Sequence, residues 1–155
     1  MSMKKVCLLL LATLLITVIV CCDENDNPAQ TLELKNFSNT GCKNSTRAGD
    51  DDIKEFVEYA VLHEGYLYVN HQNIWFNCCP GELKAEVSVE NHCITVSEWS
   101  TEEMCNCMCP FDMSYEVGPL KEGVTYTIKI GYKGVEKEVA DFVFQNTMSG
   151  VWGII

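Results

Sequence analysis

The pattern of apolar and polar residues along most of the chain is that of β-strands joined by short turns. Apolar and polar residues alternate over residues 86–97, interrupted by Asn91 and His92, which form a two-residue turn signal. Pairing across this turn places Val89 opposite Ile94 and gathers the apolar side chains of both strands on one face. A slip of one residue would expose that face, so the pattern fixes the register of the hairpin.

A second hairpin is predicted over residues 124–144, where apolar residues again alternate with polar ones. A turn in its middle pairs Ile128 with Val139 and Lys129 with Glu138. The apolar pattern changes phase near the end of the second strand, which predicts a β-bulge there.

Residues 53–62 fit two patterns. Their apolar residues fall on one stripe of a helix, but Val57, Tyr59 and Val61 also alternate as in a strand, and residues 64–65 form a turn signal. Because the chain after this segment is patterned as strands, we predict a strand here.

The segment LKEGVTY (120–126) resembles the approach to the tyrosine corner of immunoglobulin-like and fibronectin-type sandwiches. Together with a first strand or extended arm in residues 32–42, the patterns give about seven short strands. The predicted fold is therefore all-β: an antiparallel β-sandwich, immunoglobulin/fibronectin-like, with its domain in residues 53–155.

The N-terminus has the pattern of an export signal. Two lysines precede an apolar run over residues 6–20, which is too short for a spanning helix. The run ends in VIVCC, which is similar to the lipobox of bacterial lipoproteins. We predict a lipoprotein signal peptide in residues 1–21 and acylation of Cys22, with Cys21 as the alternative.

Residues 22–52 are predicted to hold the lipidated cysteine, an acidic tether and an N-terminal arm. Asp23, Glu24 and Asp26 resemble the surface-export signal of Bacteroidetes-type lipoproteins, and the same composition also makes a solvated spacer. The expected location is the cell envelope, as an outer membrane lipoprotein exposed at the surface.

The charge of the chain narrows the possible partners. It carries 22 acidic and 11 basic residues, a formal net charge of −11, and signal cleavage would also remove Lys4 and Lys5. Because nucleic acids and anionic membrane faces attract basic patches, we expect no nucleic-acid partner. Contact with a membrane is expected through the lipid anchor, and the remaining partner is an unknown protein or glycan ligand.

Cysteines are the main chemical feature of the predicted domain. An exported chain lies outside the reducing cytosol, where disulfides form and persist. Cys93 is opposite Glu90 on the polar face of the first hairpin, which sets it apart from the others. The remaining candidates for disulfides are Cys42, Cys78, Cys79, Cys105, Cys107 and Cys109.

Bonds between segments are expected, because adjacent residues of an extended chain point to opposite faces. Cys78 and Cys79 would pair with cysteines of residues 105–109 or with Cys42, fixing residues 74–79 against 104–112. A Cys42–Cys78 bridge is one such pairing, and the full connectivity stays open.

A metal site is the alternative use of the same residues. Cys105 and Cys109, a cysteine of NCC and His71 would offer four soft ligands to one zinc or copper(I) ion. Against this, the C-x-C-x-C spacing differs from that of zinc knuckles, and His71 fits an exposed turn residue equally well. Disulfides need no cofactor, so none is expected under that interpretation.

Motifs for catalysis are not found: the chain contains no G-x-S-x-G, P-loop or G-x-G-x-x-G sequence. We therefore predict no catalytic residue and no enzyme activity. Trp99 falls on the polar face of its hairpin, which makes it a candidate for contact with a partner. Trp75 is the better candidate for core packing.

Three segments carry a resemblance to a known family: FSNTGC (37–42), NHQNIWFNCCPGEL (70–83) and CNCMCPFDMSYEVGPL (105–120). Together they resemble an uncharacterised family of small cysteine-rich Bacteroidetes-type lipoproteins, over most of residues 37–130. The distinctive blocks are N-C-C-P and C-x-C-x-C-P-[FY]-D. The matching residues are Cys42, His71, Cys78, Cys79, Cys105, Cys107, Cys109 and Asp112. The resemblance implies an address and a fold, and no activity.

Two functions remain open from the sequence. The first is a lipid-anchored, non-catalytic binding or structural module of the cell envelope, a β-sandwich stabilised by disulfides. The second is a metal-binding or thiol-redox envelope protein that uses the cysteine cluster and His71.

Overall fold

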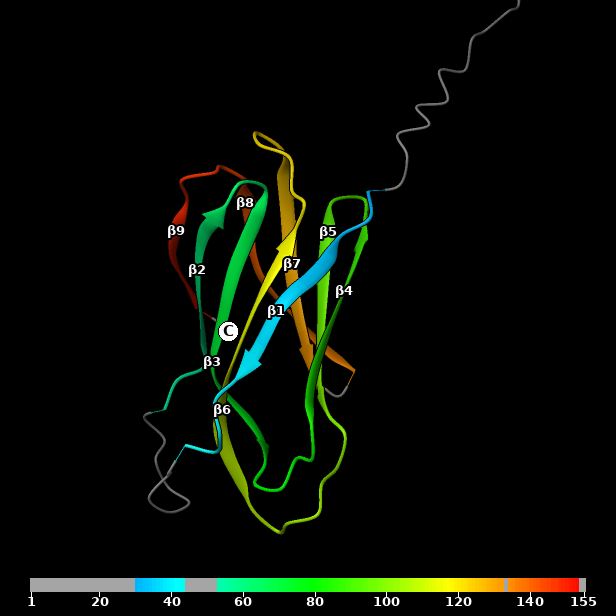
Figure 1. Cartoon of the computed structure of the whole chain (residues 1–155), viewed down its shortest axis with the longest axis vertical. Helices are drawn as coiled ribbons and strands as arrows, with labels where there is room; N and C mark the ends of the chain where they lie inside the picture. The colour runs from blue at the N-terminus through cyan, green and yellow to red at the C-terminus, as the bar shows by residue number, and fades with distance from the viewer. Residues whose placement is uncertain (1–29, 44–52, 133, 154–155) are drawn as a thin grey trace, which may run out of the picture.

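The described residues of the computed structural model, 30–43, 53–132 and 134–153, form nine strands in two facing sheets (Figure 1). They contain no helix, and the predicted all-β sandwich is confirmed, with nine strands where about seven were expected. The predicted signal peptide, its acylation site and the acidic tether lie outside the described residues.

The larger sheet has the strand order β1-β6-β3-β2-β9, and all its neighbouring strands are antiparallel. Its last strand was not predicted; it is a short edge strand that contains Gly150 and Gly153 and pairs with β2. The strands of this sheet are β1 (Glu33–Asn39), β2 (Phe56–His63), β3 (Tyr66–Asn77), β6 (Met108–Gly118) and β9 (Ser149–Gly153).

The smaller sheet has the order β4-β5-β7-β8. Its central pair, β5 and β7, is parallel, because the chain leaves β5, adds β6 to the other sheet and then returns. The sandwich is thus not purely antiparallel. Its strands are β4 (Leu83–Glu90), β5 (Cys93–Ser100), β7 (Thr125–Tyr132) and β8 (Val135–Val143).

The register predicted for the first hairpin is confirmed. Val89 lies opposite Ile94, and Cys93 lies opposite Glu90. The turn residues have positive φ, 49° at Asn91 and 63° at His92, as a type I′ hairpin turn requires. The register places Ile94 in the core, where it is fully buried.

The second hairpin is confirmed in part. Lys129 pairs with Glu138 as predicted, but Ile128 pairs with Ala140 and not with Val139. The register shift lies between Ile128 and Lys129, so the predicted bulge occurs earlier in the hairpin than its apolar pattern indicated.

The strand predicted over residues 53–62 forms β2, and the turn after it contains Gly65 with a φ of 78°. The corner predicted before β7 also forms, since the Tyr126 hydroxyl accepts a hydrogen bond of 3.1 Å from the Lys121 N–H. Large apolar side chains from both sheets fill the core; Phe76 of β3 and Ile128 of β7 are fully buried. Burying one such side chain stabilises the fold by about 1.5–3 kcal/mol.

Candidate functional site

The inward face of β3 carries a histidine among apolar residues. Leu67 and Val69 are fully buried, and His71, the next inward position, is only 1% exposed. A bulge at Asn73, whose φ is 62°, then changes the phase so that Ile74 points into the core. The interpretation of His71 as an exposed turn residue is therefore wrong, since the strand continues through it.

A buried carboxylate faces His71 from the opposite sheet. Glu98 follows Ile94 and Val96 in the inward alternation of β5 and is 1% exposed. Its Oε2 lies 2.8 Å from the Nδ1 of His71, and its Oε1 accepts a 2.8 Å hydrogen bond from the Tyr115 hydroxyl. Both carboxylate oxygens thus have a partner in the core.

The same histidine bonds a second carboxylate nearer the surface. The Nε2 of His71 lies 2.9 Å from Oε1 of Glu55, whose side chain is 27% exposed. Lys137 Nζ lies 3.5 Å from the other oxygen of Glu55. A polar chain therefore runs from Tyr115 through Glu98, His71 and Glu55 to Lys137 at the surface.

The two carboxylates set the charge of the histidine. Burial alone would lower the pKa of His71, but the charges and hydrogen bonds of Glu98 and Glu55 outweigh it and raise that pKa to about 9. The hydrogen bond from His71 in turn lowers the pKa of Glu55. Burial and the adjacent Glu98 raise the pKa of Tyr115 well above 10. At neutral pH the centre is a histidinium between two carboxylates.

A pocket of about 450 Å³ opens beside this polar chain. Its volume falls within the usual range of small-molecule sites, which are mostly apolar with a few polar groups. Strands of both sheets contribute to it, and apolar side chains make up most of its wall. The lining residues are Glu55, His71, Ile74, Trp75, Glu98, Met108, Ile130, Gly131, Tyr132, Val135 and Lys137.

The polar part of the pocket wall is satisfied from within the protein. Both ring nitrogens of His71 and both oxygens of Glu98 are engaged, and no buried side-chain nitrogen or oxygen of the described residues lacks a partner. A histidinium with both N–H groups bonded has no free lone pair to act as a base. The geometry therefore suits binding better than acid–base catalysis.

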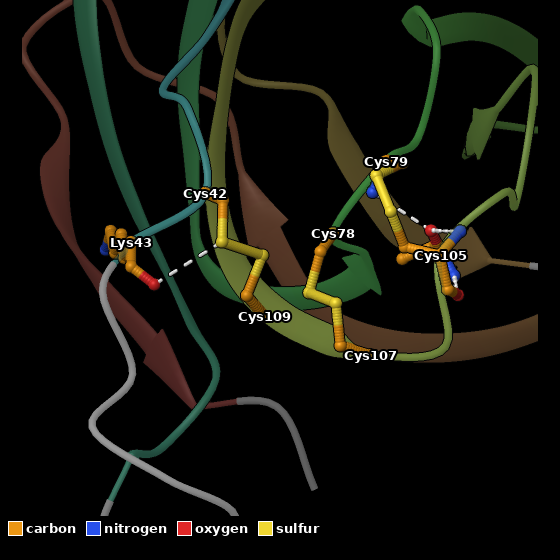
Figure 2. The surroundings of a disulfide bond; sticks show 8 residues. Cys42, Lys43, Cys78, Cys79, Cys105, Cys107 and Cys109 are labelled. Carbon is orange, nitrogen blue, oxygen red and sulfur yellow. Dashed lines mark hydrogen bonds between the residues drawn. A yellow bond between two sulfur atoms is a disulfide. The ribbon is translucent and has the colours of Figure 1, made fainter.

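The cysteines that the structure describes form three disulfides, which lie in a row at one end of the larger sheet (Figure 2). Their Cα–Cα distances of 5.3–5.7 Å fall in the ordinary range for such bonds. The prediction that residues 74–79 are fixed against 104–112 is confirmed. The bonded pairs are Cys42–Cys109, Cys78–Cys107 and Cys79–Cys105.

The suggested Cys42–Cys78 bridge is wrong, and strand pairing gives the reason. Phe76 pairs with Cys109, and continuing that ladder puts Cys78 beside Cys107, with a hydrogen bond of 3.1 Å from the Cys78 N–H to the Cys107 carbonyl. Cys42 follows β1, on the other side of β6, and so meets Cys109.

Asn77 organises the turn that carries two of these cysteines. Its Oδ1 accepts hydrogen bonds from the N–H of Cys79, at 2.9 Å, and of Cys105, at 3.1 Å, and its Nδ2 donates to the Cys105 carbonyl. The asparagine of the N-C-C-P block thus holds both backbones in place for the Cys79–Cys105 bond.

The disulfides adjoin the pocket along the chain. Met108, which lines the pocket, lies between Cys107 and Cys109, and Trp75 lies three residues before Cys78. Bonds on both sides of Met108 restrain the pocket wall, which lowers the entropy lost when a ligand binds.

The predicted metal set with His71 is not assembled. His71 turns both ring nitrogens to carboxylates, and the cysteines predicted as its co-ligands are bonded to other cysteines. Among the described residues, the Sγ atoms of Cys42, Cys78 and Cys109 do lie within 4.8 Å of one another. That group would become a thiolate cluster only after reduction.

Asp112, the last residue of the C-x-C-x-C-P-[FY]-D block, holds the bulge of β3 in place. Its Oδ1 accepts a 3.1 Å hydrogen bond from the Asn73 N–H, and its carboxylate forms an ion pair with Lys43. Lys43 also donates to the Asn73 side chain at 2.9 Å. These contacts give Asp112 a structural role beside Cys42.

The remaining predicted residues lie apart from the pocket or at its edge. Trp99 pairs with Lys84 on β4, is half-buried and does not line the pocket, so its contact with a partner stays a prediction. Trp75, expected in the core, is half-buried and lines the pocket. Cys93 is unbonded among the described cysteines, as its place on the polar face predicted.

Sequence reasoning missed Glu98, Glu55 and Tyr115. A signal for Glu98 was present, because the confirmed register puts it in phase with Ile94 and Val96 on the apolar face. Glu55 had none, since its contact with His71 is tertiary.

No family model, no curated protein and no solved structure matches this chain. Within the part of the chain that the structure describes, no helix is long and apolar enough to cross a membrane.

Proposed function

We propose that this protein is a lipid-anchored, non-catalytic binding module of the cell envelope, held rigid by its disulfides. The observation that carries the binding role is the apolar pocket between the sheets, whose Met108 is flanked by two disulfide-bonded cysteines. A largely preformed cavity of this size with mostly apolar walls is the usual form of a small-molecule site.

The anchor and address rest on the N-terminal sequence. The run that ends at Cys21 and Cys22 is similar to a lipobox, and the acidic residues after it favour export to the outer surface. The resemblance to Bacteroidetes-type lipoproteins supports the same address. Disulfide-bonded cysteines are consistent with an oxidising compartment.

The anchor is tested by fractionation and mass. The wild-type chain should stay with membranes and carry acyl groups on Cys22, whereas Cys22→Ser should be soluble in the envelope. If Cys21→Ser has that effect and Cys22→Ser does not, acylation is at Cys21. Soluble wild-type protein without acyl groups would contradict the anchor.

The binding role is tested with N-phenyl-1-naphthylamine, an apolar dye that fluoresces when it leaves water. Val135→Trp places an indole at the pocket rim, where Val135 is 64% exposed and tolerant of replacement. Val151→Trp is the matched control, because Val151 is 61% exposed and lies outside the pocket. Dye binding lost in the first variant and kept in the second supports the role; equal binding in both contradicts it.

A second candidate function is favoured by the cysteine group already described. Reduction of the Cys42–Cys109 and Cys78–Cys107 bonds would free four thiols. The Sγ atoms of three of them, Cys42, Cys78 and Cys109, lie within 4.8 Å of one another in the oxidised protein, and as thiolates they would suit copper(I) or zinc. Native mass spectrometry of reduced protein with each metal tests it. One bound ion that is lost in Cys78→Ser supports this function, and an unchanged mass rules it out.

A further inference from the structure

We infer that the pocket accepts an uncharged small molecule with an aromatic or alkyl body, and that it excludes anions and cations of the same shape. This inference rests on the proposed binding function, since it names the class of ligand for the same pocket. Three features of the pocket carry it: its apolar interior, the balance of its charges and the pairing of its polar atoms.

The interior of the pocket is apolar and reaches into the core. Ile74 and Ile130 are 3% and 4% exposed, so the inner wall belongs to the packed interior of the sandwich. Trp75, Tyr132 and Met108 line it as well, and Met108 is 46% exposed. Such a hollow removes the apolar body of a ligand from water, which is the main favourable contribution to binding in sites of this type.

The charges on the wall balance. Glu55 and Glu98 are carboxylates, and they face the histidinium of His71 and the ammonium of Lys137. With two charges of each sign at neutral pH, the wall has no net charge that would attract a charged ligand. A salt-bridged wall without excess charge complements a neutral ligand.

The polar atoms at the inner end of the wall already have hydrogen-bond partners within the protein. Glu98 uses one oxygen for His71 and the other for Tyr115, while Glu55 bonds His71 and Lys137. A charged group that reaches the inner end of the pocket would lose its hydration and find both ring nitrogens of His71 and both oxygens of Glu98 already bonded. Lys137, whose side chain is 44% exposed, lies at the outer end, where an ion stays hydrated. Burying a charge without a partner is costly, so selection against ions follows from the wall itself.

The test compares three molecules with the same body: phenylbutanol, phenylbutylamine and phenylbutyrate, which are neutral, cationic and anionic at neutral pH. The chain from residue 22 onward, with Cys22→Ser, is purified from an oxidising periplasm so that neither an acyl chain nor detergent competes. Binding is measured by calorimetry at neutral pH. We expect phenylbutanol to bind at least tenfold more tightly than either ion.

Variants at two walls locate the site. Val135→Trp on β8 and Met108→Trp on β6 should each weaken phenylbutanol at least tenfold. Their controls, Val151→Trp and Met104→Trp, replace exposed residues outside the pocket and should leave affinity unchanged. Melting temperatures identify any variant that fails to fold. Because the two substitutions lie on different walls of the pocket, the test still works if one of the two variants does not fold.

The outcomes separate the two proposals. If an ion binds as tightly as phenylbutanol and the pocket variants weaken it, the inference about the ligand class is overturned and the binding role stands. If none of the molecules binds, or binding ignores both pocket variants, the binding role of the pocket falls together with the inference.

Discussion

His71 of β3 and Glu98 of β5 form a hydrogen bond of 2.8 Å that crosses the core from one sheet to the other. Each residue replaces an apolar side chain in an inward-facing series, and each is 1% exposed. The bond therefore places an ion pair at positions where the sequence pattern predicts apolar side chains packed in the core. It also forms the polar wall of the pocket, which links the stability of the fold to its proposed function.

Stability should fall as the pH rises through the titration of His71. The folded-state pKa is raised from 6.5 to about 9, so protonated His71 favours the folded state. This contribution is complete below about pH 6.5, declines as the pH rises and is lost above about 9. Its size is at most on the order of 3 kcal/mol. Urea unfolding at a series of pH values measures it.

Two variants control that experiment. Glu98→Gln removes the carboxylate that contributes most to the raised pKa, so its stability should change less between pH 6.5 and 9. His63→Gln replaces a histidine whose side chain is 68% exposed and should keep the wild-type profile. A wild-type profile in Glu98→Gln would show that the pH dependence arises elsewhere.

Tyr115→Phe should destabilise the fold without opening a large cavity. It removes the hydroxyl that donates to Glu98 Oε1 at 2.8 Å, and it leaves a buried carboxylate oxygen without a donor. The expected loss is about 1–3 kcal/mol in the free energy of unfolding. Tyr68 lies in the same sheet but is half-buried, so the free energy of unfolding of Tyr68→Phe should stay within about 0.5 kcal/mol of wild type. Equal losses would contradict a special role for the Tyr115 hydroxyl.

Much of the fold could be predicted because its signals are local. The register of the first hairpin follows from alternation and from a turn at Asn91 and His92, and all of it lies in one short segment. The bulge in the second hairpin was harder to place, since Val139, which it leaves unpaired between Ala140 and Glu138, fits the alternation of its strand. The short edge strand β9 pairs with a strand far away in sequence, and no local pattern indicates it.

Asn77→Ala should destabilise the turn that carries the Cys79–Cys105 bond. The side chain of Asn77 bonds both backbones, so its loss leaves two N–H groups and a carbonyl without these partners. We expect a loss of about 1–3 kcal/mol and slower formation of that disulfide during oxidative refolding, while Cys42–Cys109 forms at its normal rate. Peptide mapping at timed intervals measures both, and equal delays at the two bonds would argue against the local role.

Asp112→Ala should leave every cysteine bonded as in the wild type but lower stability. The Asn73 N–H at the bulge and the Lys43 ammonium both lose a partner, whereas the disulfides depend on strand pairing. A cost of about 1–3 kcal/mol is expected from thermal or urea unfolding. Free thiols appearing at Cys42 or Cys109 would instead mean that Asp112 directs the disulfide beside it.

Most of the candidate site could not be predicted from the sequence, because it is made by contacts between strands of different sheets. His71 and Glu98 lie on different sheets, and sequence periodicity describes one strand at a time. The pairing of cysteine segments was predictable from the alternation of faces, but the partner of Cys42 depends on the order of strands in the sheet, which places β1 beside β6.

The most direct test of a disulfide-stapled module is the intact mass of residues 23–155, purified from an oxidising compartment and alkylated before or after reduction. The same sample is measured under native conditions to retain any metal. The structure predicts that Cys93 alone reacts before reduction and that all the cysteines of this segment react after it. Cysteines that react without reduction but only after chelation, together with a native mass that carries an extra metal ion, would contradict it and favour a metal site.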